Sequence, residues 1–179
     1  LSSDEIWAAS EEGVYNAKLN SPNLVDFNNW NLISDIPVIN RECKDLEIVG
    51  TDLFVLRSNF GNTSEIYKFS NNSWSVFQSN TSQIYTIRNI NDNLWLCQSN
   101  IIKELSVNGI QQSSIAFDGD DDFRDVNQVD SRLFIADYQR SLVETLGDSY
   151  ETIKPDGPMR SDISAIHSIG DQTWAVAGK

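Results

Sequence analysis

An aspartate-rich run is the part of the sequence whose residue types come nearest to chemistry. Asp118, Asp120 and Asp122 alternate in it with the spacing of carboxylate ligands in a calcium-binding loop. However, Phe123 stands where such a loop needs glycine, and Val129 stands where it needs a bidentate glutamate. We therefore expect a solvated loop without a cofactor, and a weak Ca²⁺ site formed by Asp118, Asp120 and Asp122 is the alternative.

The residues needed for common catalytic sites are scarce. His167 is the only histidine, so a histidine-based metal cluster or a His–His acid/base pair cannot be assembled within this chain. No serine has the Gly-x-Ser-x-Gly context of a nucleophile elbow, and no glycine-rich phosphate loop follows a strand. Paired carboxylates brought together from distant loops stay open. We expect a structural role for His167 and no enzymatic activity.

Charge and hydropathy exclude two classes of partner. The 179 residues carry a formal net charge of −13, whereas binding to nucleic acid or to an anionic lipid surface needs a basic footprint. The sequence also lacks eighteen consecutive apolar residues, so no membrane insertion is expected.

Cys43 and Cys97 fall in apolar, strand-like stretches. We interpret them as buried free thiols, although sequence alone leaves a disulfide open.

A repeat organises the whole chain. An aromatic residue flanked by strand-forming residues recurs at intervals of 47, 41, 39 and 40 positions. These intervals are typical of β-propeller blades. The five aromatic residues are Trp7, Phe54, Trp95, Phe134 and Trp174. Such regular recurrence predicts packing between blades rather than stacking on sugars.

The repeat extends upstream of each aromatic residue except Trp7. Apolar residues stand eleven, eight and five positions before the aromatic, as in Phe123, Val126 and Val129 before Phe134. A polar turn separates the last of these from the aromatic residue. Two short apolar strands joined by such a turn predict a β-hairpin.

Two further strand candidates follow the aromatic strand in every blade except the last, and an aromatic residue recurs on the outermost one at Trp30, Trp74 and Tyr150. The pattern predicts an all-β fold, a β-propeller fragment that forms an open arc of about four blades of four-stranded antiparallel sheets. The expected blades, of which the first and last are incomplete, cover residues 4–34, 41–80, 81–117, 123–154 and 162–177.

The incomplete blades suggest an arc from a larger ring. The first lacks its innermost strand and the last lacks its outer pair, so each presents strand edges and apolar faces that proteins normally cover. We expect neighbouring blades to cover them in a longer chain. In the isolated chain, self-association is the expected alternative.

Two motifs resemble known families. The sequence IWAAS at residues 6–10, running on to GVY at 13–15, is similar to the blade motif of bacterial two-component-regulator propellers. The sequence GPMRSDI at 157–163, followed by residues 170–178, resembles the N-terminal propeller of PorZ-like proteins of the Bacteroidetes type IX secretion system. The later blades lack the Gly-Thr and Gly-Leu signatures of the sensor propellers, which favours the second resemblance.

These resemblances imply a location in the periplasm or at the bacterial cell surface. The PorZ-like reading implies a non-catalytic binding or scaffold module that helps to attach secreted cargo to lipopolysaccharide. The alternative is a periplasmic sensing propeller of a hybrid two-component regulator that recognises oligosaccharides. In either case we expect a protein partner or a glycan to bind through the least regular loops, at residues 34–41, 58–64, 117–123 and 154–161.

Overall fold

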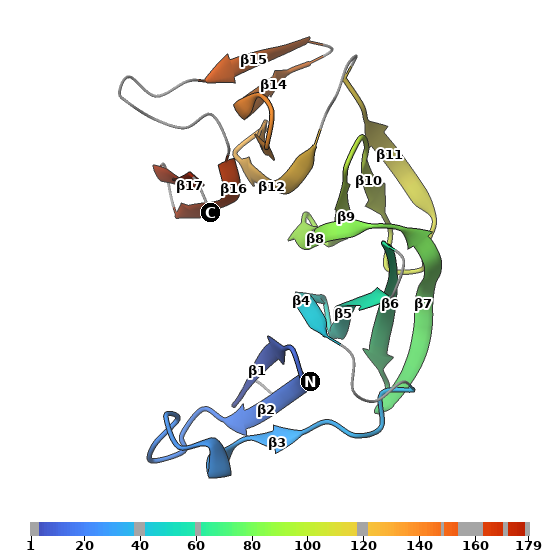
Figure 1. Ribbon diagram of the computed structural model, residues 1–179, viewed down its shortest axis with the longest axis vertical. Helices are drawn as coiled ribbons and strands as arrows, with labels where there is room; N and C mark the ends of the chain where they lie inside the picture. The colour runs from blue at the N-terminus through green and yellow to red at the C-terminus, as the bar shows by residue number, and fades with distance from the viewer. Residues whose placement is uncertain are drawn as a thin grey trace. The chain divides into compact units, whose positions relative to one another are not determined.

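The chain folds almost entirely into antiparallel β-sheet in the computed structural model (Figure 1). The structure describes residues 4–37, 42–59, 62–117, 122–147, 149–153, 163–169 and 172–177. In these ranges, no helix has the length and apolar character needed to cross a membrane. The chain divides into two compact units, Leu1–Gln83 and Ile84–Lys179, each described by itself below.

The first unit contains two sheets. One has three strands in the order β1-β2-β3, and the other has four in the order β4-β5-β6-β7. A short 3-10 helix, Phe27–Asn29, lies between β2 and β3. The strands are β1 Glu5–Ser10, β2 Gly13–Lys18, β3 Asn31–Leu32, β4 Cys43–Val49, β5 Asp52–Asn59, β6 Thr63–Ser70 and β7 Ser73–Ser82.

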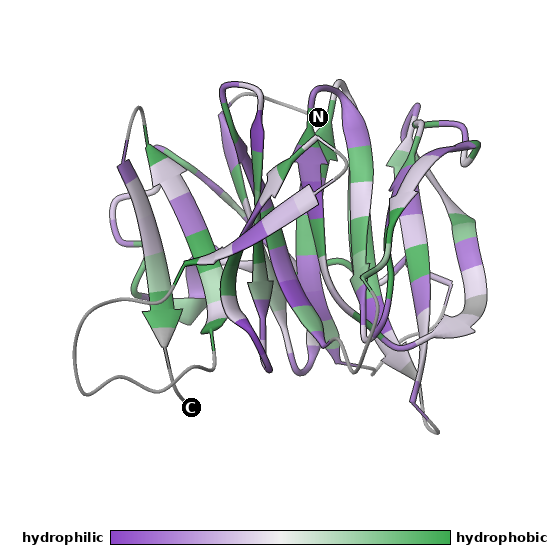
Figure 2. Cartoon of the chain, turned by 90° about the horizontal axis from the view of Figure 1, so that it is seen from above, coloured by the Kyte–Doolittle hydropathy of each residue, from purple (hydrophilic) through white to green (hydrophobic). Residues whose placement is uncertain are grey.

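The second unit contains two four-stranded sheets and a hairpin. Their strand orders are β11-β10-β9-β8, β12-β13-β14-β15 and β16-β17. Polar and apolar residues intermingle along the strands (Figure 2). The strands are β8 Ile84–Ile90, β9 Asn93–Gln98, β10 Ile102–Leu105, β11 Gln111–Ile115, β12 Phe123–Val129, β13 Arg132–Asp137, β14 Ser141–Leu146, β15 Ser149–Ile153, β16 Ile163–Ile169 and β17 Gln172–Ala177.

Four inner hairpins share one register. In each, the repeated aromatic residue pairs with the residue seven positions before it, as in Glu47 with Phe54 and Arg88 with Trp95. The other two pairs are Asn127 with Phe134 and His167 with Trp174. The aromatic residues therefore occupy equivalent positions, as the repeat predicts, and the all-β propeller fold is confirmed.

The same hairpins share a β-bulge near the start of the inner strand. The register shifts between Cys43 and Asp45, and again between Phe123 and Asp125. The strands β8 and β16 shift at the matching places. A bulge leaves one residue unpaired and reverses the alternation of side chains beyond it. It therefore allows apolar residues three positions apart to point to the same side of the sheet.

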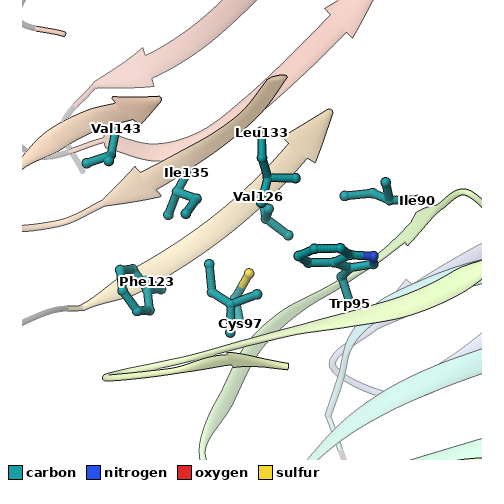
Figure 3. Close-up of a cluster of buried hydrophobic side chains, with 9 residues drawn as sticks. Ile90, Trp95, Cys97, Phe123, Val126, Leu133, Ile135 and Val143 are labelled. Atoms are coloured by element: carbon teal, nitrogen blue, oxygen red, sulfur yellow. The ribbon is translucent and has the colours of Figure 1, made fainter. Parts of the chain in front are cut away.

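Each blade has two apolar faces, which we name by what they pack against. Within each unit, the forward face carries the repeated aromatic residue and packs on the next blade of that unit where one follows. The rear face carries the apolar neighbours of that residue and packs on the previous blade of the same unit. In the second unit, Ile90, Trp95 and Cys97 form a forward face that meets a rear face on the next blade (Figure 3). The rear face comprises Phe123, Val126, Leu133, Ile135 and Val143.

A buried carboxylate ties three inner strands together in the second unit. Asp125 on β12 accepts two hydrogen bonds from Arg88 on β8, from Nε at 2.9 Å and from Nη2 at 3.0 Å. It also accepts one from the backbone N–H of Ile166 on β16, at 3.1 Å, and one from that of Val126. Burial raises the pKa of Asp125, and the Arg88 guanidinium and the two backbone donors oppose that rise.

Most repeated aromatic residues are buried, but the last one is not. Phe54 and Phe134 are buried, Trp95 is 9% exposed and Trp7 is half-buried. Trp174 is 63% exposed, since among the described residues no further blade lies on its forward face. Cys43 and Cys97 are both buried and form no disulfide, as the sequence indicates.

Replacing Trp95 by alanine should lower the free energy of unfolding by about 3–5 kcal/mol, because a large aromatic side chain leaves a cavity between two blades. Trp174→Ala is the matched control, since it changes the same repeat position where the ring is exposed. Its loss should stay below about 1 kcal/mol. Chemical denaturation at low protein concentration measures both values. Equal losses would contradict the assignment of Trp95 to the blade interface.

Replacing Asp125 by alanine should lower the free energy of unfolding by about 3–5 kcal/mol, because it leaves the Arg88 guanidinium without its buried carboxylate. A double-mutant cycle with Arg88→Met measures the pair itself. The double variant should lose less stability than the sum of the two single losses, with a coupling of about 0.5–3 kcal/mol. Strictly additive losses would show that the pair contributes no coupling.

Candidate binding groove

A groove of about 610 Å³ opens between the two sheets of the first unit. Its walls combine aromatic rings with carboxylate and amide side chains, a mixture typical of small-molecule sites. Four strands and two connecting segments contribute to it. The lining residues are Glu5, Trp7, Asn16, Ile33, Asp35, Phe69, Asn72 and Trp74.

A tight turn positions two of the aromatic rings. Asn71 and Asn72 have positive φ angles of 51° and 59°, as a type I′ hairpin turn requires at both central positions. Asparagine tolerates this conformation better than most residues do. The turn joins β6 to β7 and pairs Phe69 directly with Trp74 across the two strands. The Phe69 and Trp74 ring centroids consequently lie 5.0 Å apart.

The third ring comes from the facing sheet. Trp7 lies on β1, and its ring centroid is 6.3 Å from that of Phe69, with the ring planes inclined at 42°. Beside it, Asn16 on β2 is the cross-strand partner of Trp7. The three tilted rings give the groove an apolar wall that no single blade could supply.

Polar groups surround these rings. The Trp74 indole Nε1 donates a hydrogen bond to Asp35 Oδ1 at 3.1 Å, which fixes both side chains at the groove. Lys18 donates a hydrogen bond to Glu5 Oε1 at 3.2 Å. This bond raises the pKa of Lys18 above its ordinary value, and the charges of Asp4 and Glu5 also favour its protonated form. The groove thus offers anchored carboxylates together with the amides of Asn16 and Asn72.

The indole N–H of Trp7 has no hydrogen-bond partner among the described residues, although it is buried. The same is true of Trp95, at the equivalent repeat position in the second unit. The unpaired N–H is therefore a property of the repeat and does not by itself indicate a ligand in the groove.

The structure describes only part of the Ca²⁺ site predicted from the sequence. Asp118 and Asp120 lie outside the described residues. Asp122 forms an ion pair with Arg124, whose guanidinium carbon lies 3.9 Å from the centroid of the Tyr85 ring. Within the described ranges, no group of three His, Cys, Asp or Glu side chains could hold a metal ion. The Ca²⁺ site at these aspartates stays a prediction.

The other predicted site features are distributed over the chain. His167 is exposed on β16 and pairs with Trp174 across the hairpin. Of the four irregular segments expected to bind a partner, residues 154–161 lie outside the described part, as do 38–41, 60–61 and 118–121. Asp35 belongs to the first of these segments and lies in the groove.

Sequence reasoning assigned Trp7 and Trp74 to packing and overlooked Phe69, Asn16 and Asn72. One signal for the groove was present in the sequence FSNNSW at residues 69–74. Two asparagines between strand residues indicate a two-residue turn, which places the flanking aromatic residues side by side. This segment gives no indication that residues of the facing sheet, such as Trp7, also line the groove.

Comparisons with known proteins support the fold alone. No protein-family model and no curated protein matches the sequence. Among solved structures, the extracellular domain of a protein described as a one-component system of B. thetaiotaomicron is similar, with a TM-score of 0.71 and 14% identity over 99% of this chain. YCF48 bound to D1 peptide has a TM-score of 0.70 and 13% identity over the whole of this chain.

PorZ of Porphyromonas gingivalis is a third similar structure, with a TM-score of 0.60 and 18% identity over the whole of this chain. It is described as an essential bacterial surface component of the type IX secretion system. The chain spans 25% of the one-component-system structure, 24% of PorZ and 59% of YCF48. At these identities the likeness establishes propeller architecture and leaves function to the site itself.

Proposed function

We propose that the chain is a non-catalytic, ligand-binding propeller of a bacterial envelope protein, and that the groove of its first unit binds saccharide. The observation that carries this proposal is the combination of three aromatic rings with carboxylates and amides in one groove. The apolar C–H faces of a pyranose ring match the aromatic wall, while its hydroxyl groups match carboxylate and amide oxygens. Similarity to an extracellular domain and to a surface component supports the envelope location.

The positions of the carboxylates support binding without catalysis. A glycoside hydrolase needs one carboxyl group kept protonated as the general acid and a second carboxylate across the scissile bond. In this groove Glu5 accepts a hydrogen bond from the Lys18 ammonium, and Asp35 accepts one from the Trp74 indole. Each of these carboxylates is thus already paired with a hydrogen-bond donor of this chain, which supports a role in binding over a role as a catalytic pair.

Charge distinguishes two finer versions of this function. A PorZ-like module that helps to attach cargo to lipopolysaccharide would meet an anionic glycan, and a sensing propeller would recognise an oligosaccharide. The groove contains Glu5 and Asp35, and the chain carries a net charge of −13. Because like charges repel, these features favour a neutral oligosaccharide. A role in secretion stays the second candidate, supported by the likeness to PorZ.

Titration with neutral hexasaccharides of glucose, xylose and mannose should reveal binding of at least one of them by calorimetry. Trp74→Ala should weaken that binding about tenfold or more, a change of ~1.4 kcal/mol, because it removes one ring and releases Asp35. Tyr150→Ala is the matched control, since Tyr150 occupies the corresponding outer-strand position on β15 in the second unit. Asp35→Asn keeps the shape of the groove and should also weaken binding.

Three results would contradict parts of the proposal. Equal weakening of saccharide binding by Trp74→Ala and Tyr150→Ala would show that the binding site does not lie in the groove. Binding to lipopolysaccharide micelles without binding to any neutral hexasaccharide would favour the secretion-associated function. Release of shorter sugars during prolonged incubation would show that the chain is an enzyme.

A further inference from the structure

The hairpin β16–β17 presents an apolar forward face to solvent. Ile169 is 65% exposed, Trp174 63% and Val176 58%. All three lie on one side of the hairpin, at the repeat positions that carry the forward face of a blade. An exposed cluster of this kind on a regular sheet typically marks an interaction surface.

The other blades of the second unit show what covers this face. Ile90, Trp95 and Cys97 occupy the same repeat positions and are buried against the rear face of the next blade. One repeat later, Val129, Phe134 and Ala136 are buried against Ile163 and Ile166 of the hairpin. The forward face is therefore complementary to the rear face of a blade. The apolar residues of that rear face include those on both sides of the repeated aromatic position in the sequence.

The three-stranded sheet β1–β3 carries a rear face of this type. Ala8 follows the repeated aromatic residue Trp7, and Tyr15 is the cross-strand partner of Ala8. The same two positions are occupied by Val55 and Tyr67 in the next blade, and there they are buried.

In the sheet β1–β3 Tyr15 is buried as well, with Phe27 packed against it, and an apolar hollow of about 410 Å³ lies beside them. Its lining includes Ala8, Tyr15, Phe27 and Trp30, with Glu11 and Glu12 among the residues around it. Phe27 is 63% exposed and packs edge-on against Tyr15, with ring centroids 5.4 Å apart. The hollow thus offers aromatic surface at the rear position of a blade.

We propose that the forward face of β16–β17 docks on the rear face of β1–β3 in a second copy of this chain, with Trp174 entering the hollow beside Phe27. The contact repeats the interface that the blades already form within each unit, so it needs no new type of packing. It joins two different surfaces, and each copy carries both of them. Two such contacts close a symmetric pair, and successive single contacts extend the assembly.

Light scattering of the chain 1–179 should show a molar mass that rises with concentration, measured with reductant present. Trp174→Glu should raise the dissociation constant at least tenfold, because it places a charge in an apolar contact, while the midpoint of chemical denaturation stays unchanged. Val25→Glu is the matched control, since Val25 is exposed, apolar and outside both faces. A mass that is independent of concentration, or equal effects of the two variants, would overturn the proposal.

Complementation tests the pairing of the two faces. Phe27→Glu should block the hollow, so that neither this variant nor Trp174→Glu self-associates. A mixture of the two should form a one-to-one complex, because one variant keeps an intact rear face and the other an intact forward face. If both variants are monomeric and their mixture is monomeric as well, the two faces are not partners. If either variant still assembles like the parent chain, the contact lies elsewhere.

Discussion

The alternation of side chains across a β-strand is the constraint on which this structure depends. The inner strands carry apolar residues on both sides, so each sheet has two faces to bury, and within each unit neighbouring blades bury the faces that meet. In the second unit, Trp95 and its forward-face neighbours meet the rear face built around Phe123 and Ile135. The four inner hairpins share one register because of this requirement, since a slip of one residue would exchange the two faces of a strand. The exposed Trp174 shows the same constraint without a covering blade among the described residues.

This alternation also explains how much of the fold the sequence could predict. The apolar positions eleven and eight residues before each aromatic are three apart, which in a regular strand would place them on opposite faces. Phe123 and Val126 nevertheless pack into the same core. The β-bulge between Phe123 and Asp125 reconciles the two facts, since it adds one residue and restores the side-chain direction. The spacing therefore indicates the bulge as well as the hairpin, although only the hairpin was inferred from it.

What the sequence could not predict are contacts between positions that do not repeat. Asp125 receives Arg88 from the previous blade and the Ile166 N–H from the next, yet the residues matching Asp125 in the other inner strands are Asp45, Thr86 and Ala165. A search for repeats compares equivalent positions, so a hydrogen-bonded bridge that forms at only one of them is not detected. The groove escaped prediction for the same reason. Trp7 was assigned to the core with its equivalents, but the unrepeated neighbours Asp35 and Asn72 give its ring a polar setting.

The groove exists because the repeat is weakest there. The outermost strand of the first sheet, β3, has two residues, whereas the facing β7 has ten. A strand this short covers little of the side of its sheet, so the rings of Trp7, Phe69 and Trp74 line an open groove instead of closing into a core. Of the polar residues beside them, Asp35 lies in a connecting segment and Asn72 in a turn, outside the strands that pack between blades. The polar lining of the groove can consequently change at Asp35 and Asn72 with little effect on the inner strands, while the aromatic wall is constrained by the fold.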